Sequence, residues 1–338
     1  MNQFFYVIYY EKEIPIGKSI FQLMEFDTTT FNFDAIPCKY SNKVLRHFLN
    51  KKLTVLVAGN IFATGENTYH FIDGIGDESV FKRINIVIDD LFKVNKKINY
   101  TLFKEFYPTR EKTKYLIEKH HYLQFNIDDD MLLKVDRKWH SFNDLLSEYK
   151  TKYRSRSKRV LEKSKSIIIK EFSLENIKEN AIKMDELYQQ VLKNSSFNIG
   201  VFKLQTFMRL KERLPDKYTV FGYFLNDNLI GFRTSFIHNN SLDASFIGLD
   251  YKFNLKYNLY QKILIDYVNY GLENKVKIIN FGRTAETMKS CVGAEPIAMN
   301  LYIRAKHKYG RFLLRMIVNN IKPTVYSSRR PFKKQHYK

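Results

Sequence analysis

The sequence predicts an α+β (α/β mixed-sheet) protein of two domains, each a twisted mixed sheet flanked by helices. The first reason is size, because 338 residues, 44% of them hydrophobic, can bury two cores of ordinary size. The second is pattern, since short runs with a period of two alternate with segments of helical spacing. The third is order: both halves place hairpin strands before a helix and a further strand. This order favours a duplicated module.

The first domain is expected over residues 1–136. Residues 4–26 alternate like two strands around a turn that contains Glu, Pro and Gly. The runs KLTVLVAG, NTYHFID and INYTLFKEF predict further strands. Residues 79–96 place their apolar side chains on one helical stripe, which predicts a helix before the last of these strands.

The second domain is expected over residues 137–310, because the composition changes near residue 136. Ser141 is predicted to cap a strongly basic helix over residues 142–163. Three strands, YTVFGYFL, LIGFRTSFI and LDASFIGLD, are separated by tight polar turns and predict an antiparallel meander. The remaining expected elements are helices over 175–194, 203–213 and 257–273 and the strand VKIINFG.

Charge and cysteine content limit the partners and the compartment. A formal charge of +21 favours a polyanion, which could be nucleic acid, an anionic membrane or a phosphate-rich cofactor. Cys38 and Cys291 are too few for a disulfide framework, which favours a reducing compartment. No run approaches the roughly 18 apolar residues that would span a bilayer. We therefore expect a cytoplasmic protein, either free or peripheral on the inner membrane.

Several motifs with known chemistry are incomplete. Gly17-Lys18-Ser19 resembles a phosphate-binding loop, but Lys12 stands where the first glycine is needed. GIGDES at residues 74–79 lacks a third glycine, and its acidic residues suit a helix N-terminus better than a pyrophosphate. No histidines or cysteines have metal-ligand spacing, so no metal site is expected.

Three segments of the second half together resemble a known family. The boundary segment WHSFNDLLSEYKTKYRSRSKRVLEKS contains a Trp, a Phe and spaced basic residues. The meander, helix and strand follow in order, with LIGFRTSFI as a glycine-marked central strand. NFGRTAETMKSCVGAEP then combines a strand end, a glycine and a K-x-x-x-G pattern. Over roughly residues 135–300 the chain thus resembles the GNAT acyltransferases, specifically the double-domain branch of FemABX-like transferases and bacterial long-chain-base N-acyltransferases. The resemblance implies tandem GNAT-like domains.

The resemblance also implies a donor site. Its central strands would splay apart and hold the pantetheine arm of a thioester, either acyl-CoA or an acyl carrier protein, with no bound cofactor. Phe246, Ile247 and Gly248 would lie nearest the arm. The donor phosphates would rest near the next helix. There the chain lacks the glycine-rich loop of common GNAT enzymes and offers Lys256 and Tyr257. An aminoacyl-tRNA donor, as in FemABX enzymes, is the alternative.

Acyl transfer to an amine needs alignment, loss of one proton and stabilisation of an oxyanion. Arg283 and Lys289 follow the strand beside the expected gap and would present positive charge. Tyr260 would protonate the departing thiolate or position the donor, and Asp250 would accept or orient the amine proton. The structural alternatives are a solvated loop for the two cations, core packing for Tyr260 and helix capping for Asp250.

The acceptor site is expected near the boundary segment. Trp139, Lys152 and Arg154 belong to a helical region that would close over the site or form a basic surface. Arg233, in the central strand, would be costly if it were buried without a partner. It would therefore face the acceptor or pair with Asp243.

The third expected segment, residues 311–338, is a basic amphipathic tail. From Tyr302 to the last residue there are many Lys and Arg and no acidic side chain. An apolar helical face flanked by cations favours an anionic membrane surface. Nucleic acid is the less favoured partner, and a docked core helix is the third alternative.

The sequence therefore predicts an N-acyltransferase at the cytoplasmic membrane face. It would move an acyl group from a thioester to the amine of a lipid-like acceptor, such as a sphingoid base or an aminolipid. One alternative is a FemABX-type, aminoacyl-tRNA-dependent peptidoglycan aminoacyltransferase, although no long helical hairpin is expected. The other is a non-catalytic nucleic-acid-binding protein, although no recognised binding module is present.

Overall fold

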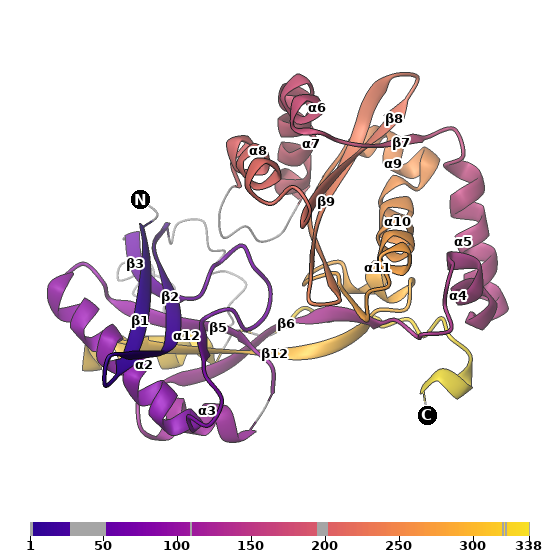
Figure 1. Ribbon diagram of the computed structural model, residues 1–338. Helices are drawn as coiled ribbons and strands as arrows, with labels where there is room; N and C mark the ends of the chain where they lie inside the picture. Colours follow the sequence, from indigo (N-terminus) through magenta and orange to yellow (C-terminus); the bar gives the residue numbers. More distant parts are fainter. Residues whose placement is uncertain are drawn as a thin grey trace. The chain divides into compact units, whose positions relative to one another are not determined.

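The computed structural model describes residues 3–27, 52–108, 110–194, 202–319, 321 and 323–337 (Figure 1). The chain divides into two compact units. Unit 1 comprises Met1–Asp129 and Ala298–Val325, and unit 2 comprises Asp130–Ile297 and Tyr326–Lys338. Each unit therefore contains residues from both halves of the chain.

Unit 1 contains a mixed sheet in the order β1-β2-β3-β5-β12, with β4 beside β2. The strands are β1 (Gln3–Glu11), β2 (Ile14–Asp27), β3 (Lys52–Ala58), β4 (Tyr69–Phe71), β5 (Tyr100–Phe106) and β12 (Glu295–Ala305). β3 and β5 are parallel, and the other neighbours are antiparallel. The helices are α2 (Asp77–Val94), α3 (Arg110–Glu118) and α12 (Lys308–Val318).

The predicted hairpin over residues 4–26 is confirmed, but its turn lies earlier than expected. Lys12 and Glu13 form the turn, with φ of 47° and 67°, the left-handed conformation that a two-residue hairpin turn requires. Gly17 instead lies inside β2, where a Cβ atom would come within 2.3 Å of the Phe71 ring. This glycine therefore allows β4 to pack closely on β2.

In unit 2 the strands follow the order β6-β11-β10-β9-β8-β7 and include parallel and antiparallel neighbours. The strands are β6 (Leu123–Lys134), β7 (Ile168–Glu171), β8 (Tyr218–Leu225), β9 (Asn228–His238), β10 (Ser241–Leu249) and β11 (Ile278–Asn280). The helices are α4 (Phe142–Glu148), α5 (Thr151–Lys163), α6 (Leu174–Glu179), α7 (Ala181–Asn194), α8 (Leu204–Arg213), α9 (Tyr251–Tyr257), α10 (Leu259–Glu273) and α11 (Glu286–Ser290). The predicted meander is confirmed as β8, β9 and β10.

Each unit completes its sheet with a strand from the other half of the chain. In unit 1, residues 300–305 of β12 pair with β5, and in unit 2, residues 132–134 of β6 pair with β11. Both units thus have antiparallel strands, a helix, a parallel strand and an antiparallel closing strand, which supports the predicted duplication. The exchange also explains why residues 298–310 lie with unit 1 and not in the second domain expected over 137–310.

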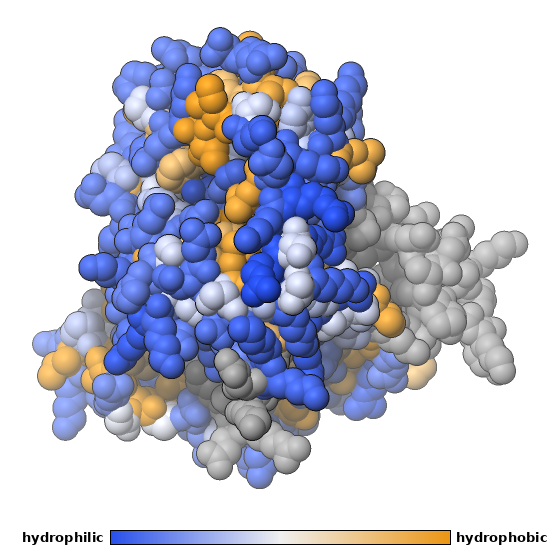
Figure 2. Space-filling view, turned by 90° about the vertical axis from the view of Figure 1, so that its right-hand side faces the viewer, coloured by the Kyte–Doolittle hydropathy of each residue, from blue (hydrophilic) through white to orange (hydrophobic). Residues whose placement is uncertain are grey.

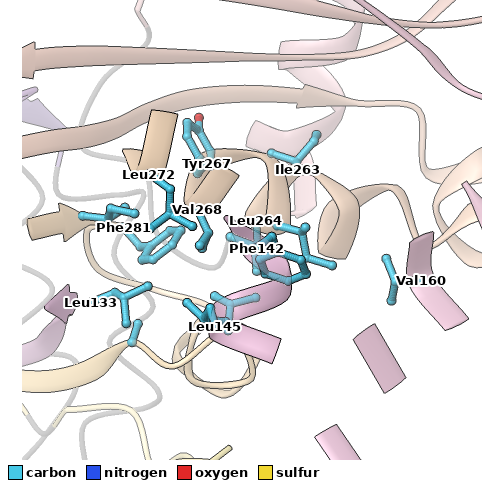
Figure 3. Packing of buried hydrophobic residues seen from close by; sticks show 14 of the residues in the cluster. Leu133, Phe142, Leu145, Val160, Ile263, Leu264, Tyr267, Val268, Leu272 and Phe281 are labelled. Atoms are coloured by element: carbon cyan, nitrogen blue, oxygen red, sulfur yellow. The ribbon is translucent and has the colours of Figure 1, made fainter. Parts of the chain in front are cut away.

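Helices cover both faces of the unit 2 sheet. α10 packs on one face, and α7 and α8 pack on the other. On the α10 side, Ile263, Leu264 and Val268 are buried together with Phe142 and Leu145 of α4 (Figure 3). Because helices cover both faces of the sheet, β9 has apolar residues on both faces, and they do not alternate with polar ones.

Two expected helices are each divided. The basic helix predicted over residues 142–163 is α4 and α5, and Ser141 caps α4 as predicted by accepting a hydrogen bond from the backbone N–H of Asp144. The break follows from Tyr149, which pairs through its backbone with Phe332 instead of continuing the helix. The helix predicted over 175–194 is α6 and α7, divided at Asn180.

Residues 326–337 form what we call the C-terminal strap, which packs on unit 2. Phe332 is fully buried, and its ring stacks on Trp139 with centroids 5.3 Å apart. Lys150 N–H donates to Pro331 O (2.8 Å), and Lys333 N–H donates to Glu148 O (3.0 Å). The residues expected to form one tail, 311–338, are thus divided, because α12 belongs to unit 1 and the strap belongs to unit 2.

Loss of the Phe332 ring should destabilise unit 2. Phe332→Ala is expected to lower the free energy of unfolding by about 3 to 5 kcal/mol, because it leaves a cavity beside Trp139. Denaturant unfolding followed by the fluorescence of Trp139, the only tryptophan, measures this change. Val325→Ala, at a side chain that is 98% exposed, is the control and should change little. Equal stability of the two variants would contradict a docked strap.

Candidate functional site

The two parallel strands of unit 2 part after a short pairing. β10 pairs with β11 only from Ser241 to Asp243, although β10 continues to Leu249. The register between β10 and β9 also shifts between Ala244 and Ile247, as at a β-bulge. The last six residues of β10 therefore lack β11 as a partner. This is the splayed geometry that the resemblance implies.

Unit 1 has no such parting in its corresponding strands. β3 pairs with β5 up to Ala58, the last residue of β3. Beyond it, Lys104 Nζ donates to Asn60 O (3.3 Å) and to the Glu105 carboxylate (2.8 Å), and Gly65 N–H donates to the same carboxylate (2.9 Å). These bonds fix the loop after β3 against the end of β5.

The three residues predicted nearest the donor have packed side chains. The ring of Phe246 stacks on Phe202 with centroids 4.2 Å apart. Ile247 packs against the hydrophobic core, and a Cβ atom on Gly248 would come within 2.2 Å of the Phe232 ring. Donor contact at these positions stays a prediction, and it would involve the backbone edge of β10.

A short helix, α9, follows β10 where a glycine-rich loop would stand in common GNAT enzymes. Asp250 caps it, accepting a hydrogen bond from Lys252 N–H (3.0 Å). At the start of α10, Tyr260 N–H donates to Asn254 Oδ1 (2.9 Å), so this N–H is already occupied. Lys256 is exposed and lies over the Tyr257 ring, 5.1 Å from its centroid. The capping alternative for Asp250 is thus the one the geometry supplies.

Four buried polar side chains lie together at the end of β11, and we call them the β11 cluster: Asp130, Asn280, Glu286 and Lys289. Asn280 Nδ2 donates to Asp130 Oδ2 (3.0 Å), and Asn280 Oδ1 accepts from Gly282 N–H (2.6 Å). Lys289 Nζ donates to Gly282 O (3.1 Å) and to Arg283 O (2.6 Å). The cluster therefore ties the strand end to the loop that follows.

That loop has an unusual backbone. Gly282, Thr284 and Ala285 have φ of 69°, 67° and 53°, and non-glycine residues adopt such values only when their surroundings impose them. The carbonyls bound by Lys289 belong to this loop, so Lys289 supplies part of that constraint. Arg283, which is half-buried, is held at a defined place as a result.

Burial changes the protonation of Lys289. Its side chain is 6% exposed, and burial lowers its pKa from the ordinary value of 10.5 to about 7. The carboxylates of Glu286 and Asp130 oppose this shift, and Arg283 adds to it. Lys289 therefore gains or loses its positive charge near neutral pH. This change alters the electrostatic environment of Glu286, Asp130 and Arg283.

Tyr260 lies next to this cluster. Burial raises its pKa above the ordinary value, and the carboxylate of Glu286 contributes to the rise. Of the four predicted catalytic residues, Tyr260 and Lys289 interact electrostatically with Glu286, and Arg283 lies in the loop that Lys289 binds. Asp250 lies at the start of α9 and has no hydrogen bond to the cluster.

Sequence reasoning missed Glu286 and Asp130. A signal for Glu286 was available, because it precedes Lys289 by three residues and so shares a helix face with it. Asp130 lies in the DDD run at 128–130, which looks like an exposed polar stretch. Only the pairing of β6 with β11 brings it to the strand end.

The predicted acceptor residues occupy different surroundings. Trp139 is buried beneath the strap, Lys152 is exposed on α5, and Arg154 is half-buried there. Arg233 is 2% exposed, and its Nε donates to the Tyr223 hydroxyl (3.1 Å). Its guanidinium lies over three aromatic rings, at these distances from their centroids: Phe221 (4.1 Å), Tyr267 (4.8 Å) and Tyr270 (5.1 Å). The predicted pairing with Asp243 is wrong, because Asp243 lies opposite Phe236 on β9.

Within the described ranges, no three His, Cys, Asp or Glu side chains are grouped so as to hold a metal ion. No helix within them has both the length and the apolar character needed to cross a bilayer.

The depressed pKa of Lys289 should make stability depend on pH. Between about pH 7 and 10.5 the unfolded chain retains a proton that the folded chain has released, so the free energy of unfolding rises with pH. Below this window the cost of burying the charge is fully present. Relative to Lys289→Met, the wild type should gain stability with a slope of at most about 1.4 kcal/mol per pH unit. Denaturant unfolding at several pH values measures it, with the exposed Lys158→Met as control. Parallel curves for wild type and Lys289→Met would contradict the buried, neutral amine.

Comparisons with known proteins identify the fold. No family model and no curated protein matches the chain. Among solved structures, FemX is similar with a TM-score of 0.53 at 10% identity, over 89% of this chain and 88% of that one. A tandem GNAT protein from the clavulanic acid biosynthesis pathway has a TM-score of 0.53 at 8% identity, over 90% and 83%. L-PGS from Bacillus licheniformis has a TM-score of 0.52 at 10% identity, over 95% and 90%.

Identities this low carry information on the fold alone. The chain therefore has a tandem GNAT-like fold, similar to that of FemX.

Proposed function

We propose that unit 2 transfers an activated acyl group to an amine, with the donor held where β10 and β11 part. The single observation that supports this most is the loss of the β11 partner after Asp243, next to the β11 cluster. An extended arm with amide groups can pair with a strand edge through main-chain hydrogen bonds. Such a placement would bring its thioester toward the buried polar groups.

The proposed proton acceptor is Glu286, not Asp250. Glu286 is 5% exposed, and its Oε1 has no hydrogen-bond partner among the described residues. The Asp250 carboxylate is occupied at the α9 cap. When the amine nitrogen attacks the acyl carbon, a C–N bond forms and the nitrogen must lose a proton, which Glu286 would receive.

The other three predicted residues have complementary roles. The hydroxyl of Tyr260 stays protonated at neutral pH, because burial raises its pKa above the ordinary value. It would donate a hydrogen bond to the thiolate that leaves when the C–S bond breaks. The positive charge of Arg283 would stabilise the developing oxyanion. Lys289 acts as a positioning residue, because its bonds to Gly282 O and Arg283 O fix the loop that carries Arg283.

We propose that the donor is an acyl carrier protein and not free acyl-CoA. A CoA pyrophosphate usually rests on free N–H groups at a helix start, whereas α9 stands there and Tyr260 N–H is occupied. A carrier protein adds contacts of its own. A lipid amine, such as a sphingoid base or an aminolipid, is the proposed acceptor, in keeping with the charge of +21 and with Tyr309 and Phe312 exposed on the basic helix α12.

A second candidate is transfer from aminoacyl-tRNA to a peptidoglycan precursor. The observation that favours it is the basic surface of α5, where Lys152, Lys158 and Arg159 are exposed. Phosphate backbones bind such surfaces without sequence preference. The absence of a glycine-rich loop also fits a donor other than CoA.

Glu286 and Asp250 should differ in their effect on transfer. Glu286→Gln is expected to lower kcat by about 10²- to 10⁴-fold, because it removes the proton acceptor at nearly constant size. Asp250→Asn should retain activity and lose at most about 1 kcal/mol of stability through a weaker cap. Amide formation, measured by mass spectrometry, tests both. Loss of activity in Asp250→Asn with full activity in Glu286→Gln would reverse the assignment.

The donor classes can be separated in one experiment. The purified protein is incubated with a panel of lipid and soluble amines and with palmitoyl carrier protein, palmitoyl-CoA or aminoacyl-tRNA in turn. We expect new amides with the carrier protein at lower donor concentration than with palmitoyl-CoA. A product from aminoacyl-tRNA alone, abolished by RNase, would replace this proposal with the second candidate. No product from any donor would argue against transferase activity.

A further inference from the structure

The parting of β10 from β11 coincides with a β-bulge whose partner lies in β9. The register between β10 and β9 shifts at this point, so that Ser245 and Phe246 of β10 together face the single residue Thr234 of β9. Two residues opposite one form a β-bulge, which bends its strand and increases the local twist. The bulge follows shortly after Asp243, the last residue of β10 that pairs with β11.

The strand that changes course at this point is β10 and not β11. After Asn280 the chain of β11 continues beside β6, because Phe281 N–H donates to Met131 O (2.9 Å) and Met131 N–H donates to Gly282 O (3.2 Å). These bonds keep it along β6 beyond its last pairing with β10. The bend at the bulge therefore accounts for the open edge of β10.

Two hydroxyl groups bind the backbone at the bulge. Phe246 N–H donates to Thr234 Oγ1 (2.9 Å), which is a side-chain acceptor. From α10, the hydroxyl of Tyr267 donates to Thr234 O (2.9 Å). Thr234 is fully buried, and Tyr267 is 2% exposed. Because a buried backbone group without a partner costs free energy, these hydroxyls stabilise the bulge.

Aromatic packing fixes the bulge from the other face of the sheet. The ring centroid of Phe246 lies 6.0 Å from that of Tyr188 on α7 and 5.6 Å from that of Phe207 on α8. Tyr267 reaches Thr234 from α10, on the opposite face. The bulge is thus held from both faces of the sheet.

We propose that Thr234 is a positioning residue for the donor: its hydroxyl fixes the β10 bulge, and the bulge keeps the edge of β10 beyond Asp243 open to an extended acyl donor. This inference rests on the proposed function, because it names what sets the geometry of that donor site. Thr234 would not contact the donor itself, since it is fully buried.

The course of β10 decides where a donor would lie. On the side of the molecule that carries α5, Figure 2 shows only a narrow hydrophobic strip between hydrophilic side chains, so this side offers an acyl arm no broad apolar surface. A backbone edge can bind the amide groups of such an arm instead. Without the bulge, each later residue of β10 would shift by one position, about 3.3 Å, and turn its side chain to the other face.

The test compares Thr234→Val, Thr234→Ser and Ser235→Ala in the full chain. Ser235 is the matched control, because it is equally buried on β9 and its hydroxyl bonds to Thr219 Oγ1 (2.7 Å) instead of to the bulge. NMR spectroscopy measures amide hydrogen exchange at Phe246 without any donor. Steady-state kinetics with palmitoyl carrier protein and an amine measure kcat and the KM of each substrate.

In Thr234→Val we expect exchange at Phe246 to be about two- to tenfold faster, the change that loss of one neutral hydrogen bond produces. The KM for palmitoyl carrier protein should rise by at least a similar factor, with the KM for the amine nearly unchanged. Thr234→Ser, which keeps the hydroxyl, should restore both values, and Ser235→Ala should change neither. Tyr267→Phe keeps the ring and should act in the same direction as Thr234→Val, so it tests the bulge if that variant does not fold.

Two results would overturn the proposal. The first is equal exchange at Phe246 in Thr234→Val and Ser235→Ala, which would mean that the bulge does not depend on the Thr234 hydroxyl. The second is faster exchange with an unchanged KM for the donor, which would separate the bulge from the donor site. A wild type that forms no amide from any donor would overturn the proposed function and the donor role of Thr234 together. The exchange rates would then still decide whether Thr234 holds the bulge.

Discussion

The buried amine of Lys289 is the interaction on which the proposed site depends. Its two hydrogen bonds, to Gly282 O and Arg283 O, hold three loop residues at positive φ directly after β11. A fully charged ammonium could not be buried there without large cost, and its pKa near 7 is the consequence. The same side chain therefore sets the shape of the loop and the local charge beside Glu286.

The parting of the parallel strands distinguishes the two units, although they share an element order. In unit 2, β10 runs on beyond Asp243 without β11, whereas in unit 1, β3 is paired to its last residue. Lys104 and Glu105 then fix the loop that follows β3. A strand edge that is already covered cannot bind an extended donor. The duplication has thus kept the sheet in both units and the candidate site in one.

Local patterns predicted much of the fold, because period and turn chemistry are local properties. The meander, the cap at Ser141 and the helix α8 needed only neighbouring residues. The strand exchange could not be predicted, since the pairing of β12 with β5 joins residues about 200 positions apart and leaves no periodic trace. Arg283 and Lys289 could be predicted because they belong to one local motif. The place of Asp130 in the site could not, because it results from the pairing of β6 with the distant strand β11.

The exchange of β6 and β12 bears on how the chain is made. During synthesis, β5 emerges about 200 residues before the strand that will cover its edge. An uncovered strand with unpaired backbone groups is a template for association between chains. Unit 1 can complete its sheet only when residues 300–305 have left the ribosome, after nearly all of unit 2. Because of the order of translation, unit 1 stays incomplete until unit 2 has been synthesised. In a chain truncated before β12, the edge of β5 would remain unpaired.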